Sequence, residues 1–340
     1  MSSAKISKML GAAVTRAGVR QKMAAHQLAS FNIDRVFMNQ LSVSMVIPTH
    51  NAAKWIDELL TNALEQSHAP AEIIVVDDGS TDNTVDIIEG RINEGVGNIH
   101  LIRRAQASGG PAVPLNKAFS VAQSPYVAIC EQDDLMYPDR FAHQLECFSL
   151  AEDLGLVTSY ASIENFEKSD QASIYETNMN LVGLQAVEMS PSIYWVKGLN
   201  AHKMLASTKP WFMRSLSGCI VRKAAWEKIG GFNETYKVAA DMDFILRLCE
   251  QFDIGIISKP LYRFRLFSNH LFLMEPLKAG EEMYHIWSSR ARSASEVLRK
   301  SSHTRAINTC INMAFEYRNR KNWGKCLTWY LRYYVERGRL

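Results

Sequence analysis

Short apolar runs alternate with helical patterns along the chain from residue 43 onward. The runs "VSMVI", "EIIVVD", "NIHLIR" and "YVAICE" predict buried strands over 43–47, 72–77, 98–103 and 126–131. Between the first two runs, apolar side chains recur at the i, i+3, i+4 spacing of one helix face, at Ile56, Leu59, Leu60, Ala63 and Leu64. Strand and helix alternate four times, which predicts an α/β fold with a parallel sheet and helices on both faces.

The pattern changes after "GLVTSY" at 155–160. Residues 164–210 are polar and irregular, and we expect loops there. Order returns at 217–234, followed by a helix near 241–251 and a strand near 254–264. From about residue 278 the pattern is helical only. It ends in an apolar stripe with basic neighbours, which we expect to pack on the domain or on a partner subunit, with membrane contact as the alternative.

Polar motifs follow three of the predicted strands. "PTHN", "DDGS" and "EQDD" each stand at a carboxyl end, where ligands bind in sheets of this kind, so they should converge on one edge. Asn51 is expected to cap the first helix, and Gly79 to permit a tight turn. Glu131, Asp133 and Asp134 crowd three acids into four residues, and a divalent cation shared with substrate phosphates would offset their repulsion.

Composition and charge narrow the class of protein. An apolar content of 47% and a charged content of 21% are those of a globular protein, and no apolar run is long enough to span a membrane. The six cysteines show no disulfide or zinc spacing and predict buried thiols. The N-terminus lacks the continuous apolar segment of a signal peptide, so we expect a cytoplasmic protein.

The net charge of +3 is unevenly distributed. Residues 1–33 carry five basic groups and no acid, residues 317–340 have a net charge of +6, and residues 34–316 are left at −8. Basic termini on an acidic body suggest peripheral contact with an anionic membrane, on its inner face, whereas a solvated tail and helix face are the plain alternative. We expect no nucleic-acid partner, and a homo-oligomer stays open.

Three stretches resemble family 2 glycosyltransferases: the segment from "VSMVIPTHN" to "VVDDGSTDNT", then "SPYVAICEQDDLMYPDRF", then "IGGFNETYKVAADMDFILRL". The resemblance covers roughly residues 43–265. It implies a GT-A-type, Rossmann-like mixed sheet flanked by helices over 41–275, preceded by a basic helical segment (1–40) and followed by an α-helical C-terminal extension (276–340). It also implies an inverting, hexosyltransferase-type enzyme that uses Mg²⁺ or Mn²⁺ and a nucleotide-sugar donor, by the family's habit a UDP-sugar.

The resemblance also implies roles for single residues. Main-chain atoms of Pro48 and Thr49, with Asn51, would line the nucleotide pocket, and the base and ribose would lie against Asp77 and Asp78. In "EQDD", Asp133 would bind the metal, while Glu131 and Asp134 would contact the donor. Asp241 would be the catalytic base that accepts the proton of the acceptor hydroxyl.

Several points stay open at this level. Asp241 could instead cap its helix, and Asp243 could be mistaken for it. His270 stands near a histidine that reaches the metal in relatives, although a lone histidine is more often structural. The family's arginine before Asn116 is replaced by Leu115, which would leave phosphate binding to the metal or to Arg103 and Arg104.

The predicted function is transfer of a sugar to a glycan or lipid-linked acceptor in polysaccharide or glycoconjugate biosynthesis. One alternative is an inactive binding or scaffold protein on the same fold, which Leu115, Glu131 and Ala240 keep open. The other is a nucleotidyltransferase, which would call for a glycine-rich loop that "PTHNAAKW" lacks.

Overall fold

The computed structural model describes residues 41–95, 97–165, 181, 184–207, 213, 215–267, 274–292 and 296–337. The predictions made for residues 1–40 and for His270 lie outside the described residues.

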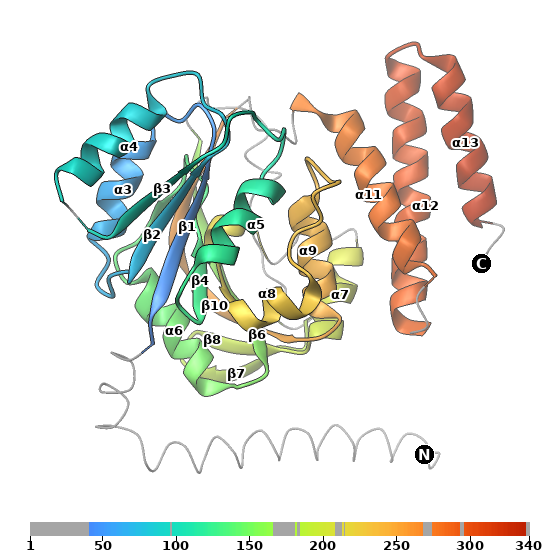
Figure 1. Ribbon diagram of the computed structural model, residues 1–340. Coiled ribbons are helices and arrows are strands. Elements are labelled where there is room, and N and C mark those ends of the chain that lie inside the picture. Colours follow the sequence, from blue (N-terminus) through green and yellow to red (C-terminus); the bar gives the residue numbers. More distant parts are fainter. Residues whose placement is uncertain are drawn as a thin grey trace, which may run out of the picture.

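The described residues contain one ten-stranded mixed sheet (Figure 1). Its strands are β1 (Val43–Thr49), β2 (Glu72–Asp77), β3 (Ile99–Arg103), β4 (Tyr126–Ile129), β5 (Leu135–Met136), β6 (Leu154–Asn165), β7 (Val187–Ser190), β8 (Ile193–Val196), β9 (Cys219–Arg222) and β10 (Asp253–Leu266). Nine of them run in the order β3-β2-β1-β4-β9-β6-β10-β8-β7, and β5 pairs with β10.

The first half of the sheet is parallel. β1 pairs in parallel with both β2 and β4, and β2 pairs in parallel with β3. Every residue of β2 and β4 is buried, which explains why these strands read as continuous apolar runs rather than as alternating patterns. The four predicted strands and their parallel arrangement are therefore confirmed.

Helices cover both faces of the sheet (Figure 1). They are α3 (Ile56–Leu64), α4 (Thr84–Asn93), α5 (Ala112–Val121), α6 (Arg140–Leu150), α7 (Gly198–Ala206), α8 (Lys223–Ile229), α9 (Ala240–Cys249), α11 (Pro276–Arg290), α12 (Glu296–Asn319) and α13 (Trp323–Arg337), with a short 3₁₀ turn, η2 (Leu216–Gly218). Apolar residues of α3 and α6 share one core with Met45 and Ile73, whereas those of α5, α7, α9 and α11 share the other with Val46 and Ile74. Side chains at alternate positions along a strand thus pack into opposite cores.

The prediction of irregular loops over 164–210 was wrong for residues 187–206. This part forms β7, β8 and α7, and β8 adds to the sheet by pairing antiparallel with β10. The short strands gain their stability from that distant partner, so the local pattern gave no sign of them.

The C-terminal helices differ in how they are buried. Met283, Ile286 and Trp287 of α11 belong to the core under the sheet. By contrast Trp323, Leu327 and Leu331 of α13 are 64%, 60% and 58% exposed, so these residues do not pack on the domain, and their packing on a partner subunit stays a prediction. Within the described ranges, no helix is long and apolar enough to cross a membrane.

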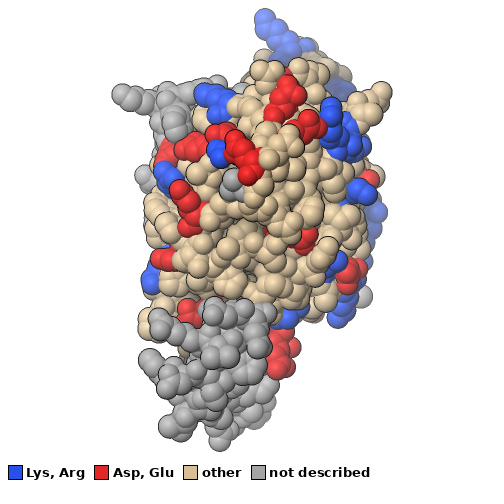
Figure 2. Space-filling view, turned by 60° about the vertical axis from the view of Figure 1, so that its left-hand side comes forward, with Lys and Arg blue, Asp and Glu red and all other residues tan. Residues whose placement is uncertain are grey.

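The cysteines and the surface charges are the remaining features of the described residues. All six cysteines are buried free thiols, as predicted. On the face drawn in Figure 2, acidic and basic side chains are interspersed around the edges and neither sign covers the face. Mixed charge of this kind is typical of the surface of a globular domain.

Candidate active site at the carboxyl edge of the sheet

The three polar motifs meet at one edge, because β2, β1 and β4 are neighbours. The Thr49 carbonyl accepts from the Asp78 N–H at 2.7 Å, and His50 Nδ1 lies 3.0 Å from the Asp78 carbonyl. On the other side, the His50 N–H donates to Gln132 Oε1 at 2.7 Å, and Gln132 Nε2 donates back to the His50 carbonyl at 3.1 Å. The predicted convergence is therefore observed, with His50 at its centre.

Asn51 joins the first two motifs rather than capping a helix. Its Oδ1 accepts from the Thr81 N–H at 2.8 Å, and its own N–H donates to Ser80 Oγ at 2.9 Å. α3 begins only at Ile56 and has no side-chain cap, so the predicted cap is wrong. The residue adopts a φ of 50°, a left-handed conformation that asparagine tolerates better than most residues.

The acids after β2 are held by donors within the fold. Asp77 accepts from the Ser80 N–H at 3.2 Å. Asp78 pairs with the Arg104 guanidinium and accepts from the N–H and Oγ of Ser108 at 2.8 and 2.7 Å. Gly79, directly after Asp78, turns the chain with a φ of +74°. A Cβ there would lie 2.7 Å from the Ala107 nitrogen, so the predicted need for glycine at this position is confirmed.

The acids after β4 are held far less completely. The Glu131 side chain receives a long hydrogen bond from Ser217 Oγ at 3.5 Å. Asp134 is 1% exposed and accepts from the Arg265 N–H at 2.9 Å and from Ser215 Oγ at 3.4 Å. Asp133 is partly buried beside them. Asp134 thus ties this loop to β10 and η2, while Glu131 and Asp133 stay closer to the surface.

Burial and mutual repulsion perturb this cluster. Burial, with the charges of Asp134, Asp133 and Asp241, raises the pKa of Glu131 well above its usual range. Burial and the charge of Asp133 raise the pKa of Asp134 to about 8, although its hydrogen bonds act in the opposite direction. Carboxyl groups that disfavour each other's ionised forms are typical of sites that bind a cation or move a proton.

The cluster suits a cation that takes part of its coordination from a ligand. In the described part of the chain, no group of three or more His, Cys, Asp and Glu side chains is arranged to hold a metal ion. Mg²⁺ commonly binds through one or two carboxylates together with substrate phosphates, and does not need a full protein cage. Asp133 and its acidic neighbours fit that arrangement.

Asp241, on α9, is near enough to the cluster for its charge to raise the pKa of Glu131. It is the second residue of that helix, and its Oδ1 accepts from the Met242 N–H at 2.7 Å. Burial raises its pKa to about 6, the hydrogen bond from Met242 opposes that rise, and the charge of Glu282 adds to it. A carboxyl group poised near neutral pH can accept a proton at little cost.

Asp243 is engaged elsewhere, which separates it from Asp241. Its carboxylate is buried and pairs with Arg247 at 2.8 Å and with Arg290 at 3.2 Å. These pairs bind α9 to itself and to α11. Asp243 therefore serves the helix packing, whereas Asp241 lies toward the acidic cluster.

Leu115 stands where the family pattern has an arginine, and Arg103 and Arg104 were the residues expected to bind phosphate in its place. Leu115 is buried in the core, so it presents no group to a ligand. Arg104 pairs with Asp78, and Arg103 lies 3.4 Å from Glu89. In the described residues both arginines are thus already engaged in ion pairs.

Sequence reasoning missed several supporting residues. Gln132 lies inside "EQDD" and could have been proposed from its place in the motif. Ser217 lies in η2, Ser215 caps that turn, and Glu282 lies in α11, and nothing local in these segments marks them. Their contribution depends on chain crossings that a pattern of apolar positions does not encode.

Comparison with known proteins gives a consistent result. The model of the family described as "Glycosyl transferase family 2" matches residues 44–230, more than half of the chain. Among curated relatives, the succinoglycan biosynthesis protein ExoU of Rhizobium meliloti is 24% identical over 209 residues, which is 60% of this chain and 56% of that protein. The chain spans about half the length, or less, of several curated relatives that it matches.

Solved structures share the fold. Residues 1–349 of TarS from S. aureus, in complex with UDP-GlcNAc, align with a TM-score of 0.58 at 21% identity and cover 85% of this chain and 90% of that one. The mannosyltransferase PcManGT from Pyrobaculum calidifontis, in complex with GDP-Man and Mn²⁺, aligns with a TM-score of 0.57 at 17% identity, covering 84% and 73%. Glycosyltransferases are thus known with this arrangement of sheet and helices.

Proposed function

Because the chain belongs to glycosyl transferase family 2, we propose that it is an inverting, metal-dependent glycosyltransferase that moves a sugar from a nucleotide-diphosphate donor to a hydroxyl acceptor. The observation that carries the proposal is the pairing of two carboxylate sites at one edge of the sheet. Asp241, with its pKa raised to about 6, lies near the crowded acids at 131–134. Inversion in a single displacement requires one site for a proton and one for the leaving diphosphate.

The donor side uses the ends of β1, β2 and β4. In this proposal the main chain of Pro48 and Thr49, with Asn51 and the Asp77–Asp78 turn, binds the nucleoside. Asp133 would hold the metal that neutralises the diphosphate, and Glu131 would contact the ribose or support Asp133. Asp134 supports the site by accepting hydrogen bonds from the Arg265 N–H and from Ser215 Oγ.

The chemistry follows from these positions. Bound Mg²⁺ or Mn²⁺ would stabilise the charge that develops on the leaving diphosphate. Asp241 accepts the proton of the acceptor hydroxyl as that oxygen attacks the anomeric carbon, and general-base catalysis of this kind typically contributes 10²–10⁴-fold. UDP-GlcNAc bound to TarS and GDP-Man with Mn²⁺ bound to PcManGT support a nucleotide-sugar donor, and we favour a UDP-sugar. The relative ExoU, a succinoglycan biosynthesis protein, supports a role in polysaccharide biosynthesis, for which we propose a glycan or lipid-linked acceptor.

The Asp241→Asn variant tests the enzyme proposal. We expect transfer to fall by about 10²–10⁴-fold, because the amide cannot accept the proton, while UDP still binds in the presence of Mn²⁺ with nearly unchanged affinity. Release of UDP from a UDP-sugar in the presence of an acceptor measures the first quantity, and thermal shift with UDP, with and without Mn²⁺, measures the second.

The pH dependence of the transfer rate is a second test of Asp241. The wild-type rate should fall as the pH drops through about 6, since protonated Asp241 can no longer act as a base. If Asp241→Asn retains full transfer, the base assignment fails. If no nucleoside diphosphate stabilises the wild-type protein with metal, the inactive scaffold becomes the better description.

A partner surface on α13 belongs to the proposal. The exposed Trp323, Leu327 and Leu331 follow one another at four-residue spacing, Lys325 and Arg332 are the neighbouring charges, and Glu336 is buried. Apolar and aromatic side chains with basic neighbours suit the interface of an anionic membrane. Sedimentation with phosphatidylglycerol vesicles tests membrane binding, which Leu327→Glu should weaken. If the face instead forms a homo-oligomer, Leu327→Glu should leave vesicle sedimentation unchanged and should change the size of the protein in gel filtration.

A further inference from the structure

The first C-terminal helix, α11, lies outside residues 44–230 yet packs directly beside α9 (Figure 1). Arg290 near its end donates to the main-chain carbonyl and to the carboxylate of Asp243, both at 3.2 Å. Glu282, two turns earlier, contacts the segment that directly precedes α9. The helix that carries Asp241 is thus held by α11 at two points with different chemistry.

Glu282 accepts three consecutive main-chain hydrogen bonds. Its Oε1 accepts from the Lys237 N–H at 2.8 Å, and its Oε2 accepts from the N–H groups of Val238 and Ala239, both at 2.9 Å. The side chain is only 8% exposed. A carboxylate this buried is stable only when donors compensate its charge, and here three peptide groups do so.

These three peptide groups lead straight into α9. Ala239 precedes the first helical residue and has no side chain that could cap the helix. The N–H groups at a helix start need acceptors, and a negative charge there is favourable. Glu282 supplies both from another helix, and Asp241 follows two residues after the last peptide it holds.

We propose that Glu282 is a positioning residue for the transfer reaction, fixing the segment 237–239 so that Asp241 is presented to the acceptor hydroxyl. The inference rests on the proposed role of Asp241 as the base. The charge of Glu282 is also one of the causes that raise the pKa of Asp241, so the two carboxylates are close enough to interact.

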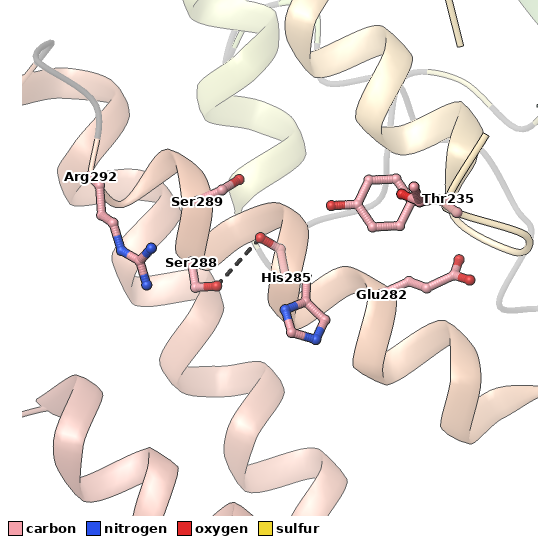
Figure 3. Close-up of a pocket in the computed structure, with 7 residues that line it drawn as sticks. Thr235, Glu282, His285, Ser288, Ser289 and Arg292 are labelled. Atoms are coloured by element: carbon pink, nitrogen blue, oxygen red, sulfur yellow. Dashed lines mark hydrogen bonds between the residues drawn. The ribbon is translucent and has the colours of Figure 1, made fainter. Parts of the chain in front are cut away.

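A cavity gives access to this contact. It measures about 490 Å³ and is lined by Thr235, Tyr236, Glu282, His285, Ser288, Ser289 and Arg292. In Figure 3 the Glu282 carboxylate points toward the segment that carries Thr235, while His285, Ser288 and Arg292 follow along α11. Shortening Glu282 would therefore leave a space that a small carboxylate could enter.

The test compares Glu282→Ala with two variants of the same helix. We expect kcat to fall by roughly ten- to a hundredfold in Glu282→Ala, because a small displacement of a reacting group costs that much, while the KM for donor and the affinity for UDP with Mn²⁺ change less than about twofold. Ser289→Ala lines the same cavity without touching the segment and should keep the wild-type rate. Arg290→Lys weakens the other α11–α9 contact and should lower Tm with little effect on kcat.

Chemical rescue makes the test specific. Sodium formate should restore a large part of kcat to Glu282→Ala, whereas sodium chloride at equal ionic strength should not, because only a carboxylate can accept from the three peptide groups. Wild-type kcat in Glu282→Ala would overturn the inference, and so would a loss of kcat that merely follows Tm, as in Arg290→Lys, without rescue by formate. Failure of the base assignment looks different, since Asp241→Asn would then retain transfer whatever Glu282→Ala does.

Discussion

Two acidic strand ends lie on either side of β1 in this protein, and the fold treats them in opposite ways. At the end of β2, the Asp78 carboxylate meets a guanidinium, a peptide N–H and a hydroxyl, from Arg104 and Ser108. At the end of β4, Glu131 and Asp134 receive long hydroxyl contacts and one peptide N–H, and the pKa of each carboxyl is raised by burial and by neighbouring acids. The charge of Asp78 is therefore well compensated within the chain, whereas the charges of Glu131 and Asp134 would be compensated only in part.

The difference indicates which carboxylates the fold stabilises by itself and which depend more on a bound cation. A compensated carboxylate stabilises the native state by giving buried donors an acceptor. A cluster of uncompensated carboxylates destabilises the free protein, and such a cost is usually found where a bound cation or a reaction removes it. The β4 end is therefore the place where ligand binding should change stability most.

The largest expected effect comes from Asp133→Asn. The variant should lose the Mn²⁺-dependent part of UDP binding and reduce transfer by about 10³-fold or more, because a metal on the leaving diphosphate supplies several kcal/mol of stabilisation in the transition state. Thermal shift with UDP across a Mn²⁺ titration, together with the rate of UDP release, measures both changes.

Asp78→Asn is the matched control at the other strand end. It should lower the free energy of unfolding by about 1–3 kcal/mol, because Arg104 and the Ser108 N–H lose part of their charged acceptor, yet Mn²⁺ should still strengthen UDP binding. If Asp133→Asn keeps the metal dependence while Asp78→Asn loses it, the two strand ends have been assigned the wrong way round.

Much of this contrast was accessible from the sequence. The parallel strands that carry both motifs are buried on two faces, so their continuous apolar runs predicted them, and the carboxyl ends of neighbouring strands must share an edge. The tight turn at Gly79 also followed from local chemistry.

The remaining features depend on contacts between distant segments. Asn51 was predicted as a helix cap because local spacing allows it, but the fold brings Thr81 and Ser80 to its side chain instead. β7 and β8 form only against β10, and Glu282 reaches the segment before Asp241 from more than forty residues away. No local pattern encodes these pairings, since each requires the sheet and its helices to be assembled first.

The smallest expected effect is a gain in stability on loss of a functional group. Glu131→Gln should stabilise the metal-free protein by about 1 kcal/mol near neutral pH, because one member of a repelling cluster is removed, while transfer falls. The folded-state pKa of Glu131 is raised, so the wild-type protein loses stability as the pH rises above the usual range of a glutamate. The advantage of Glu131→Gln should therefore vanish near pH 4 and grow toward pH 8, as urea midpoints measured in EDTA would show.

Asp77→Asn, which also removes one acid but leaves the Ser80 N–H with a weaker acceptor, should show no such gain. Equal responses of the two variants would mean that the β4 acids are as well compensated as those of β2, and the contrast between the two strand ends would not hold.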